Sequence, residues 1–181
     1  MKKVIFVAVI FLISGSAFAQ TGVKPNVIKV NPLGALFGSG TIAYERAFGH
    51  KSSIVIGPSF GIFTYDHFRY TTYGLSAEYR YYFTGIAPRG TYAAVGGNAD
   101  FGTTKFIDYE GSFNTKTNVS GFRGKIIAGH QWIWKSGFSL ELNAGGQYIL
   151  YNFRDKEGFF GTGQALSTWL PSLGLAIGYN F

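Results

Sequence analysis

The chain has 181 residues, a length that suits one domain, and a formal net charge of +7. The basic residues form no block of like charge, so nucleic acid is not an expected partner. There are no cysteines, which excludes a disulfide framework and a cysteine-ligated metal site. Aromatic residues make up 18% of the chain and glycines number 26, a combination typical of β proteins with aromatic girdles outside and a tight interior.

The first residues have the pattern of a secretory signal peptide. Lys2 and Lys3 precede a short apolar run, and Ala17 and Ala19 form a small-x-small ending. We therefore predict a signal peptide over residues 1–19 and a mature domain over residues 20–181. The alternative, a membrane anchor, is disfavoured because the run is shorter than the ~20 residues that a spanning helix needs. No later segment is apolar for long enough, so the mature chain is either exported and soluble or crosses a membrane as a barrel.

The mature chain alternates between apolar and polar residues with a period of two, which predicts β-strands with one apolar face. Eight such stretches follow one another along the chain. In order, they are Val27–Phe37, Thr41–Phe48, Ser53–Tyr65, Tyr73–Phe83, Thr91–Phe101, Val119–Ile133, Phe138–Tyr151 and Trp169–Phe181. Pro32, Pro58 and Pro171 fall inside these stretches, and because proline lacks a ladder donor we expect bulges there.

The connections alternate between short and long. Tight turns are expected at Gly49–Ser52, Gly85–Gly90 and Trp134–Gly137. Longer loops are expected at Asp66–Thr72, Gly102–Asn118 and Asn152–Ser167, whereas the first hairpin has only the short turn at Phe37–Gly40. An even number of strands puts both termini on one side, and short turns on that side with longer loops opposite is the outer-membrane pattern.

The last strand ends in Gly178-Tyr179-Asn180-Phe181, which resembles the C-terminal assembly signal of bacterial outer-membrane barrels. There a closing strand ends in Gly-aromatic-x-Phe. Gly178, Tyr179 and Phe181 are therefore the residues expected to direct insertion by the barrel assembly machinery.

The alternation shows that each strand has an apolar and a polar face, but it does not show which face points outward. A soluble lipocalin-like barrel, for example, has its apolar face inside. Two observations favour lipid outside. The polar faces carry few charges, four of each sign, as a closed interior network should: Lys29, Glu45, Glu78, Arg80, Asp100, Arg123, Lys125 and Glu141. Aromatic residues also gather near the strand ends in two belts, as expected at lipid headgroups. One belt, on the side of the termini, contains Phe48, Tyr81, Phe83, Trp132, Trp134, Tyr179 and Phe181, and the other contains Phe37, Phe63, Tyr65, Tyr73, Phe101, Phe122 and Trp169.

The charged cluster predicts a lumen plugged by side chains, because eight strands make a barrel just wide enough to be filled. A proton or ion path is the alternative, but small barrels need such filling whatever they do, which favours a structural network. Arg46 and His130 lie on the apolar face and are tolerable only near an interface.

No catalytic, cofactor or metal site is expected. Small outer-membrane enzymes that modify lipid A use a His and a Ser, and here His67 beside Asp66 in an outer loop is the nearest arrangement. Solvated loop residues explain the same pattern. Phe159 and Phe160, in the last loop, are either an anchor for a protein partner or part of the upper belt.

The mature chain as a whole resembles the small eight-stranded outer-membrane barrels of Gram-negative bacteria, the OmpA/OmpX-type group. Asn26–Leu33 and Gly40–Arg46 look like a family of such barrels of unknown function. The resemblance implies an all-β, antiparallel, up-and-down transmembrane barrel in the outer membrane, in contact with lipid and lipopolysaccharide. It implies a non-enzymatic structural, adhesion or partner-binding role, with a pore or carrier for hydrophobic molecules as the alternative and a lipid A-modifying enzyme behind both.

Overall fold

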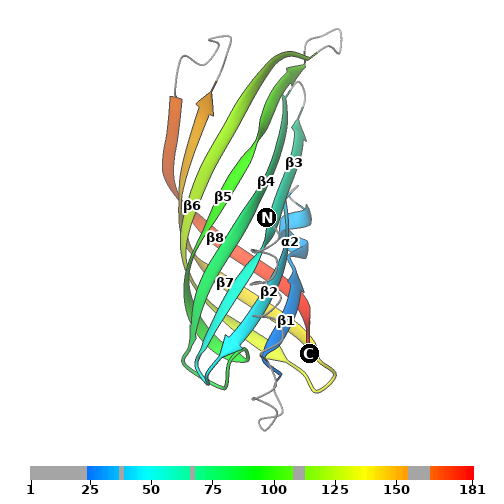
Figure 1. The fold of residues 1–181 in the computed structure, drawn as a ribbon, viewed down its shortest axis with the longest axis vertical. Coiled ribbons are helices and arrows are strands. Elements are labelled where there is room, and N and C mark those ends of the chain that lie inside the picture. Colours follow the sequence, from blue (N-terminus) through cyan, green and yellow to red (C-terminus); the bar gives the residue numbers. More distant parts are fainter. Residues whose placement is uncertain (1–23, 37–38, 66–67, 108–112, 155–163) are drawn as a thin grey trace, which may run out of the picture.

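The computed structural model describes residues 24–36, 39–65, 68–107, 113–154 and 164–181. In this part of the chain, eight antiparallel strands follow one another around a closed barrel (Figure 1). The elements are β1 (Asn26–Val30), α2 (Pro32–Leu36), β2 (Ser39–Phe48), β3 (Ser52–Tyr65), β4 (Phe68–Tyr82), β5 (Gly90–Ile107), β6 (Phe113–Ile133), β7 (Phe138–Arg154) and β8 (Gln164–Asn180).

The predicted all-β, up-and-down architecture with eight strands is confirmed. The barrel closes where β1 pairs with β8, and this pairing joins Val27–Val30 to Ile177–Asn180. The predicted signal peptide lies outside the described residues. No helix in the described ranges is long and apolar enough to cross a membrane.

Side chains alternate between the lumen and the outer surface as the sequence predicts. On β4, Glu78, Arg80 and Tyr82 are buried in the lumen, whereas Tyr79 and Tyr81 are exposed outside. The same polarity holds around the barrel, so apolar side chains form most of the outer wall and polar ones meet inside. The interior is thus the opposite of a lipocalin-like apolar core.

The strands on the side away from the termini are longer than predicted. β5 has 18 residues and β6 has 21, and they take in much of the predicted loop at Gly102–Asn118. The predicted loops at Asp66–Thr72 and Asn152–Ser167 are likewise partly strand. Their polar composition predicts loops, but a hairpin needs only paired backbones, so the strand pairing continues through polar residues.

The first predicted strand is wrong in its second half. Val27–Phe37 was expected to be one strand, but β1 ends at Val30 and the short helix α2 follows. Asn31 caps this helix, since its side-chain Oδ1 accepts a hydrogen bond from Gly34 N at 2.8 Å. Pro32 holds the first helical position, where its missing N–H is not needed.

The bulges expected at Pro58 and Pro171 are also absent. Pro58 pairs with Leu75 and Pro171 with Gly146 without a change of register. Pro58 lies instead at a gap in the pairing of β2 with β3, between the pairs Thr41–Ser59 and Tyr44–Ile56. Among the described residues Pro171 has no strand partner on its other edge, so its missing donor breaks no ladder hydrogen bond there.

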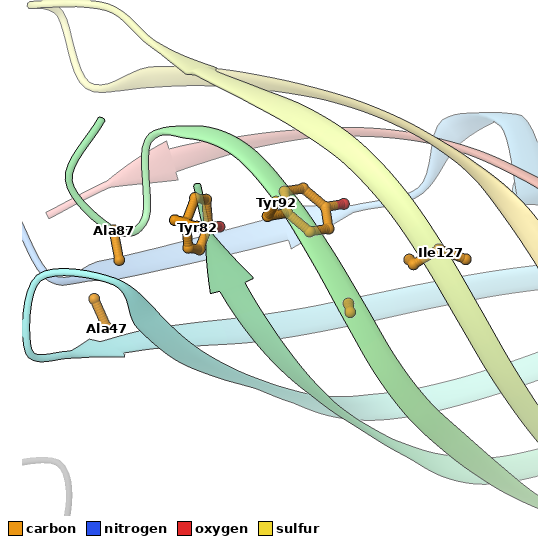
Figure 2. Packing of buried hydrophobic residues seen from close by; sticks show 6 residues of the cluster. Ala47, Tyr82, Ala87, Tyr92 and Ile127 are labelled. Atoms are coloured by element: carbon orange, nitrogen blue, oxygen red, sulfur yellow. The ribbon is translucent and has the colours of Figure 1, made fainter. Parts of the chain in front are cut away.

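At the end of the barrel where β1 begins and β8 ends, which we call the side of the termini, a small apolar cluster fills the lumen (Figure 2). Tyr82 and Tyr92 lie in the lumen with no exposed surface, and their ring centroids are 5.4 Å apart. Next to these tyrosines, the turn between β4 and β5 folds inward, and Ala87 N donates to His50 O at 2.9 Å. Ala87 and Pro88 are buried there, so this turn closes the barrel at that end.

Candidate functional site

A buried ionic cluster fills the lumen next to the apolar cluster, near the ends of β2 and β4 and the start of β7. Lys29 Nζ on β1 lies 2.6 Å from Glu45 Oε2 on β2 and 2.6 Å from Glu141 Oε2 on β7. Arg80 on β4 faces Glu141 with two parallel hydrogen bonds, of 2.8 Å from Nη1 and 2.9 Å from Nη2. All four side chains are essentially inaccessible to water. These contacts connect strands from opposite walls of the barrel.

Neutral side chains satisfy the remaining lone pairs of the cluster. Tyr82 Oη donates to Glu45 Oε1 at 2.7 Å, and Tyr92 Oη donates to Glu141 Oε1 at 2.6 Å. The Arg80 guanidinium also lies over the Tyr92 ring, 4.3 Å from its centroid. Buried charges are tolerated only when they are paired and hydrogen-bonded in this way. The cluster therefore blocks the lumen, and we refer to it as the plug.

The remaining predicted network residues form two ion pairs on the side away from the termini. Lys125 Nζ lies 2.5 Å from Glu78 Oε2, and the other carboxylate oxygen of Glu78 accepts from Arg80. Arg123 Nε lies 2.9 Å from Asp100 Oδ2. About a third of each of these two cations is exposed, unlike Lys29 and Arg80. The eight predicted residues thus form two groups. One is the buried cluster, and the other consists of the Lys125–Glu78 and Arg123–Asp100 pairs, whose cations are partly exposed.

Sequence reasoning missed two members of the buried cluster. Tyr92 was not proposed for the network, although it shares the inward parity of Asn98 and Asp100 on β5. Gln131 on β6 was not proposed for the network either, but its Oε1 accepts from Lys29 at 3.0 Å and from Arg80 at 3.2 Å. The parity of each strand was the signal that would have found both.

A cavity of about 590 Å³ lies in the lumen beyond the ionic cluster. Its walls are mainly polar, and its charged lining residues are Asp100, Arg123 and Lys125. A smaller cavity of about 110 Å³ lies against Lys29, Glu78 and the other charges of the plug. The lumen is therefore closed on the side of the termini and hollow on the other.

The wall of the large cavity is incomplete on one side. β8 pairs with β1 only from Ile177 to Asn180, so in the described part of the chain residues 164–176 have no strand partner on that edge. The helix α2 lies beside both β2 and β8 and takes the place where β1 would continue (Figure 1). We refer to this region, between α2 and residues 171–176 of β8, as the seam. Leu33 from α2 and Pro171 and Leu173 from β8 line the cavity there.

The outer surface carries the aromatic residues predicted for the two belts. On the side of the termini all seven are exposed: Phe48, Tyr81, Phe83, Trp132, Trp134, Tyr179 and Phe181. On the other side Tyr73, Phe101, Phe122 and Trp169 are exposed, while Phe37 and the side chains of Phe63 and Tyr65 lie outside the described residues. Exposed aliphatic side chains such as Ile54, Ile56, Leu75 and Ile126 fill the wall between these rows.

The two apolar-face residues that needed an interface lie near the end with the termini. His130 Nδ1 is 2.8 Å from Thr91 Oγ1, and its ring lies 4.5 Å from that of Trp132. Arg46 pairs in register with Asn26 at the start of β1.

The remaining predicted residues divide between the closing strand and the outer loops. Phe181 N donates to Asn26 O at 2.9 Å, and Gly178 pairs with Lys29 across the closure. Tyr179 projects outward and is exposed. Asp66, His67, Phe159 and Phe160 lie outside the described residues. Among the described residues, no group of three or more His, Cys, Asp or Glu side chains is arranged to hold a metal ion.

Comparison with known proteins gives one match. Residues 5–158 match the model of a family described as a protein of unknown function, DUF3575. No curated protein and no solved structure matches the chain.

Proposed function

The chain belongs to the DUF3575 family, and from this premise we propose that it is a non-enzymatic, non-conducting β-barrel of the Gram-negative outer membrane with a structural or interaction role. The proposal places lipid and lipopolysaccharide around the barrel and assigns its insertion to the outer-membrane assembly machinery. A protein partner at the surface loops remains part of the proposal.

The exposed apolar wall between two aromatic belts is the observation that carries the proposal. Side chains such as Leu75, Val95 and Ile126 are more than half exposed on this wall. Soluble monomers rarely expose a continuous apolar surface of this extent. The eight steps from Tyr73 to Tyr81 on β4 cover about 27 Å along the strand, or about 20 Å along the axis at a tilt of ~40°. This height is close to the ~25 Å apolar band of outer-membrane barrels.

The closed lumen supports a role that does not involve conduction. An open aqueous path would have to pass the Lys29–Glu141 and Arg80–Glu141 pairs and then the Tyr82–Tyr92 cluster. Each of these side chains is almost fully buried and bonded to its neighbours. A plugged eight-stranded barrel is also what interior volume predicts for this strand number.

The three tryptophans give a direct test of membrane insertion, because Trp132, Trp134 and Trp169 are all exposed and lie in the two belts. Single-tryptophan variants, with the other two changed to Phe, are reconstituted into vesicles whose acyl chains are brominated near the headgroup or near the chain end. We expect stronger fluorescence quenching by the shallow bromines at all three positions. Absence of quenching at every position would overturn insertion, and the unsubstituted protein in unbrominated vesicles is the control.

Planar bilayer recording tests the closed lumen. The reconstituted protein should give no unitary conductance steps. Regular steps from the folded barrel would replace the proposed role with that of a pore.

A further inference from the structure

We propose that the large cavity binds the headgroup of an anionic single-chain amphiphile, with the chain leaving the barrel sideways through the seam. This inference rests on the proposed membrane location, because the seam then opens toward lipid. It assigns the cavity a ligand class that the structural role does not require.

The seam leaves backbone groups without strand partners at the height of the apolar wall. On β8, Trp169 lies in one belt and Tyr179 in the other, and within the described ranges residues 171–176 between them have no strand partner on the β1 side. Unpaired N–H and C=O groups do not face hydrocarbon in stable membrane proteins unless protein or a polar cavity covers them. Pro171 removes one such donor. The short helix α2 and the polar cavity behind this edge therefore provide the cover that an unpaired strand edge needs.

Small side chains on β8 line the space behind the seam. The inward positions of β8 here are Ser172, Gly174 and Ala176. The neighbouring strand β7 contributes longer polar groups to the cavity, Gln147 and Asn143, and Asn143 lies against Gly174. The resulting volume of about 590 Å³ is within the ~300–1,000 Å³ range of ligand pockets. It suits a headgroup with part of a chain.

The charge of the cavity favours an anion. Two of its charged lining residues are cations, Arg123 and Lys125, and one is a carboxylate, Asp100. Both cations keep about a third of their surface exposed even though each is ion-paired. A phosphate or carboxylate head can therefore approach both without breaking either pair, and such charge-assisted contacts are strong when partly desolvated.

Apolar residues mark the route of the chain. Leu33 on α2 and Leu173 on β8 line the cavity, and Leu173 is 76% exposed on the outer wall. Phe60 on β3 also borders the cavity, and half of its side chain is exposed on the outer wall. A polar lumen joined to an apolar exit matches an amphiphile better than a soluble anion or a neutral oil.

The test uses the full mature chain, refolded in dodecyl maltoside, with dodecyl phosphate as the probe in a calorimetric titration. We expect saturable binding of one equivalent. The double variant Arg123→Gln, Lys125→Gln should bind at least tenfold more weakly. Lys135→Gln removes a cation from the turn at the opposite end of the barrel and should bind as the original does. Ser172→Phe fills the cavity from β8 without changing any charge, and it should also lose at least tenfold in affinity.

Each competing result has a distinct meaning. Equal affinity for zwitterionic dodecyl phosphocholine would overturn the assignment of an anionic head. Displacement of the probe by equimolar inorganic phosphate would show a site for the free anion and overturn the lateral exit for a chain. If a gel shows that the barrel is folded but the titration shows no saturable binding, the inference is overturned altogether. That failure would leave the quenching test of membrane insertion untouched, so the two proposals fail separately.

Discussion

Lys29 on β1 and Glu141 on β7 form an ion pair of 2.6 Å across the interior of the barrel, although 112 residues separate them in the sequence. The same ammonium group holds Glu45, also at 2.6 Å. One lysine therefore compensates two buried carboxylates, and it ties the first strand to walls contributed by the second and the seventh.

Replacing this lysine should be strongly destabilising. In Lys29→Met, Glu45 and Glu141 lose a shared counter-charge in a buried site, and breaking such a buried pair costs about 3–5 kcal/mol. We expect a loss of this size in the free energy of unfolding, measured by urea titration of the barrel in detergent micelles with tryptophan fluorescence. The double variant Lys29→Met, Glu45→Gln should lose less than the single variant, since one uncompensated charge is removed. If Lys29→Met loses less than about 1 kcal/mol in the free energy of unfolding, Lys29 does not form the buried ion pairs described.

Two neighbouring tyrosines provide a matched comparison of the inside and outside of the barrel. Tyr82 is buried and donates to Glu45 at 2.7 Å, whereas Tyr81 is exposed on the outer wall. Tyr82→Phe keeps the ring and removes a hydrogen bond to a charged group, so about 1.5–3 kcal/mol of stability should be lost. Tyr81→Phe should change stability by less than about 0.5 kcal/mol. Equal effects in the same urea titration would show that the two faces do not differ as described.

A glycine at the closure should tolerate no side chain. A Cβ at Gly178 would collide with the backbone oxygen of Ile28 on β1, and it would also lie 2.8 Å from Ser139 Oγ. Gly178→Val should therefore lower stability by about 1–3 kcal/mol or prevent closure. The control is Gly124→Ala, where the nearest atom to the new Cβ would be Phe122 Cε1 at 3.8 Å. Refolding yield into micelles measures both, and normal closure in Gly178→Val would show that β1 and β8 are less closely paired than described.

Deleting Phe181 should impair assembly in cells more than folding in vitro. Phe181 closes the barrel by one backbone hydrogen bond to Asn26 and leaves its ring exposed, so its removal should cost little stability. If the ring is part of the assembly signal, the deletion should reduce the yield in outer-membrane fractions, while refolding into detergent stays normal. Phe181→Trp keeps an aromatic ending and should restore the yield. An unchanged yield for the deletion counts against the closing-signal interpretation.

Much of the fold could be predicted from the sequence because alternation and lumen geometry are local. The period-two pattern assigned Glu78, Arg80 and Tyr82 to one face, and that face is the interior. The polar faces carry four cations and four carboxylates, and these equal numbers predicted that the charges would pair in the interior. Which charges pair was not predictable, because Lys29 and Glu141 become neighbours only after the register of every strand between them is set.

The errors have identifiable physical causes. Asn31 and Pro32 are a helix cap and a first helical residue, but the apolar residues after them, LGAL, fit a strand pattern in the sequence. The seam was missed with the helix, because it exists only where β1 stops and β8 continues. The long hairpins exceed the predicted strands because their polar composition predicts loops, although strand pairing continues there.

The central claim is that this barrel is closed and surrounded by lipid, and an unboiled-versus-boiled gel of outer-membrane fractions tests it most directly. A closed barrel with Lys29, Arg80 and Glu141 locked in its interior should resist the detergent until it is heated. We predict a compact band in the unboiled sample that shifts to the position of the unfolded chain on boiling. A protein recovered in the soluble periplasmic fraction, without a heat-dependent shift, would contradict the account.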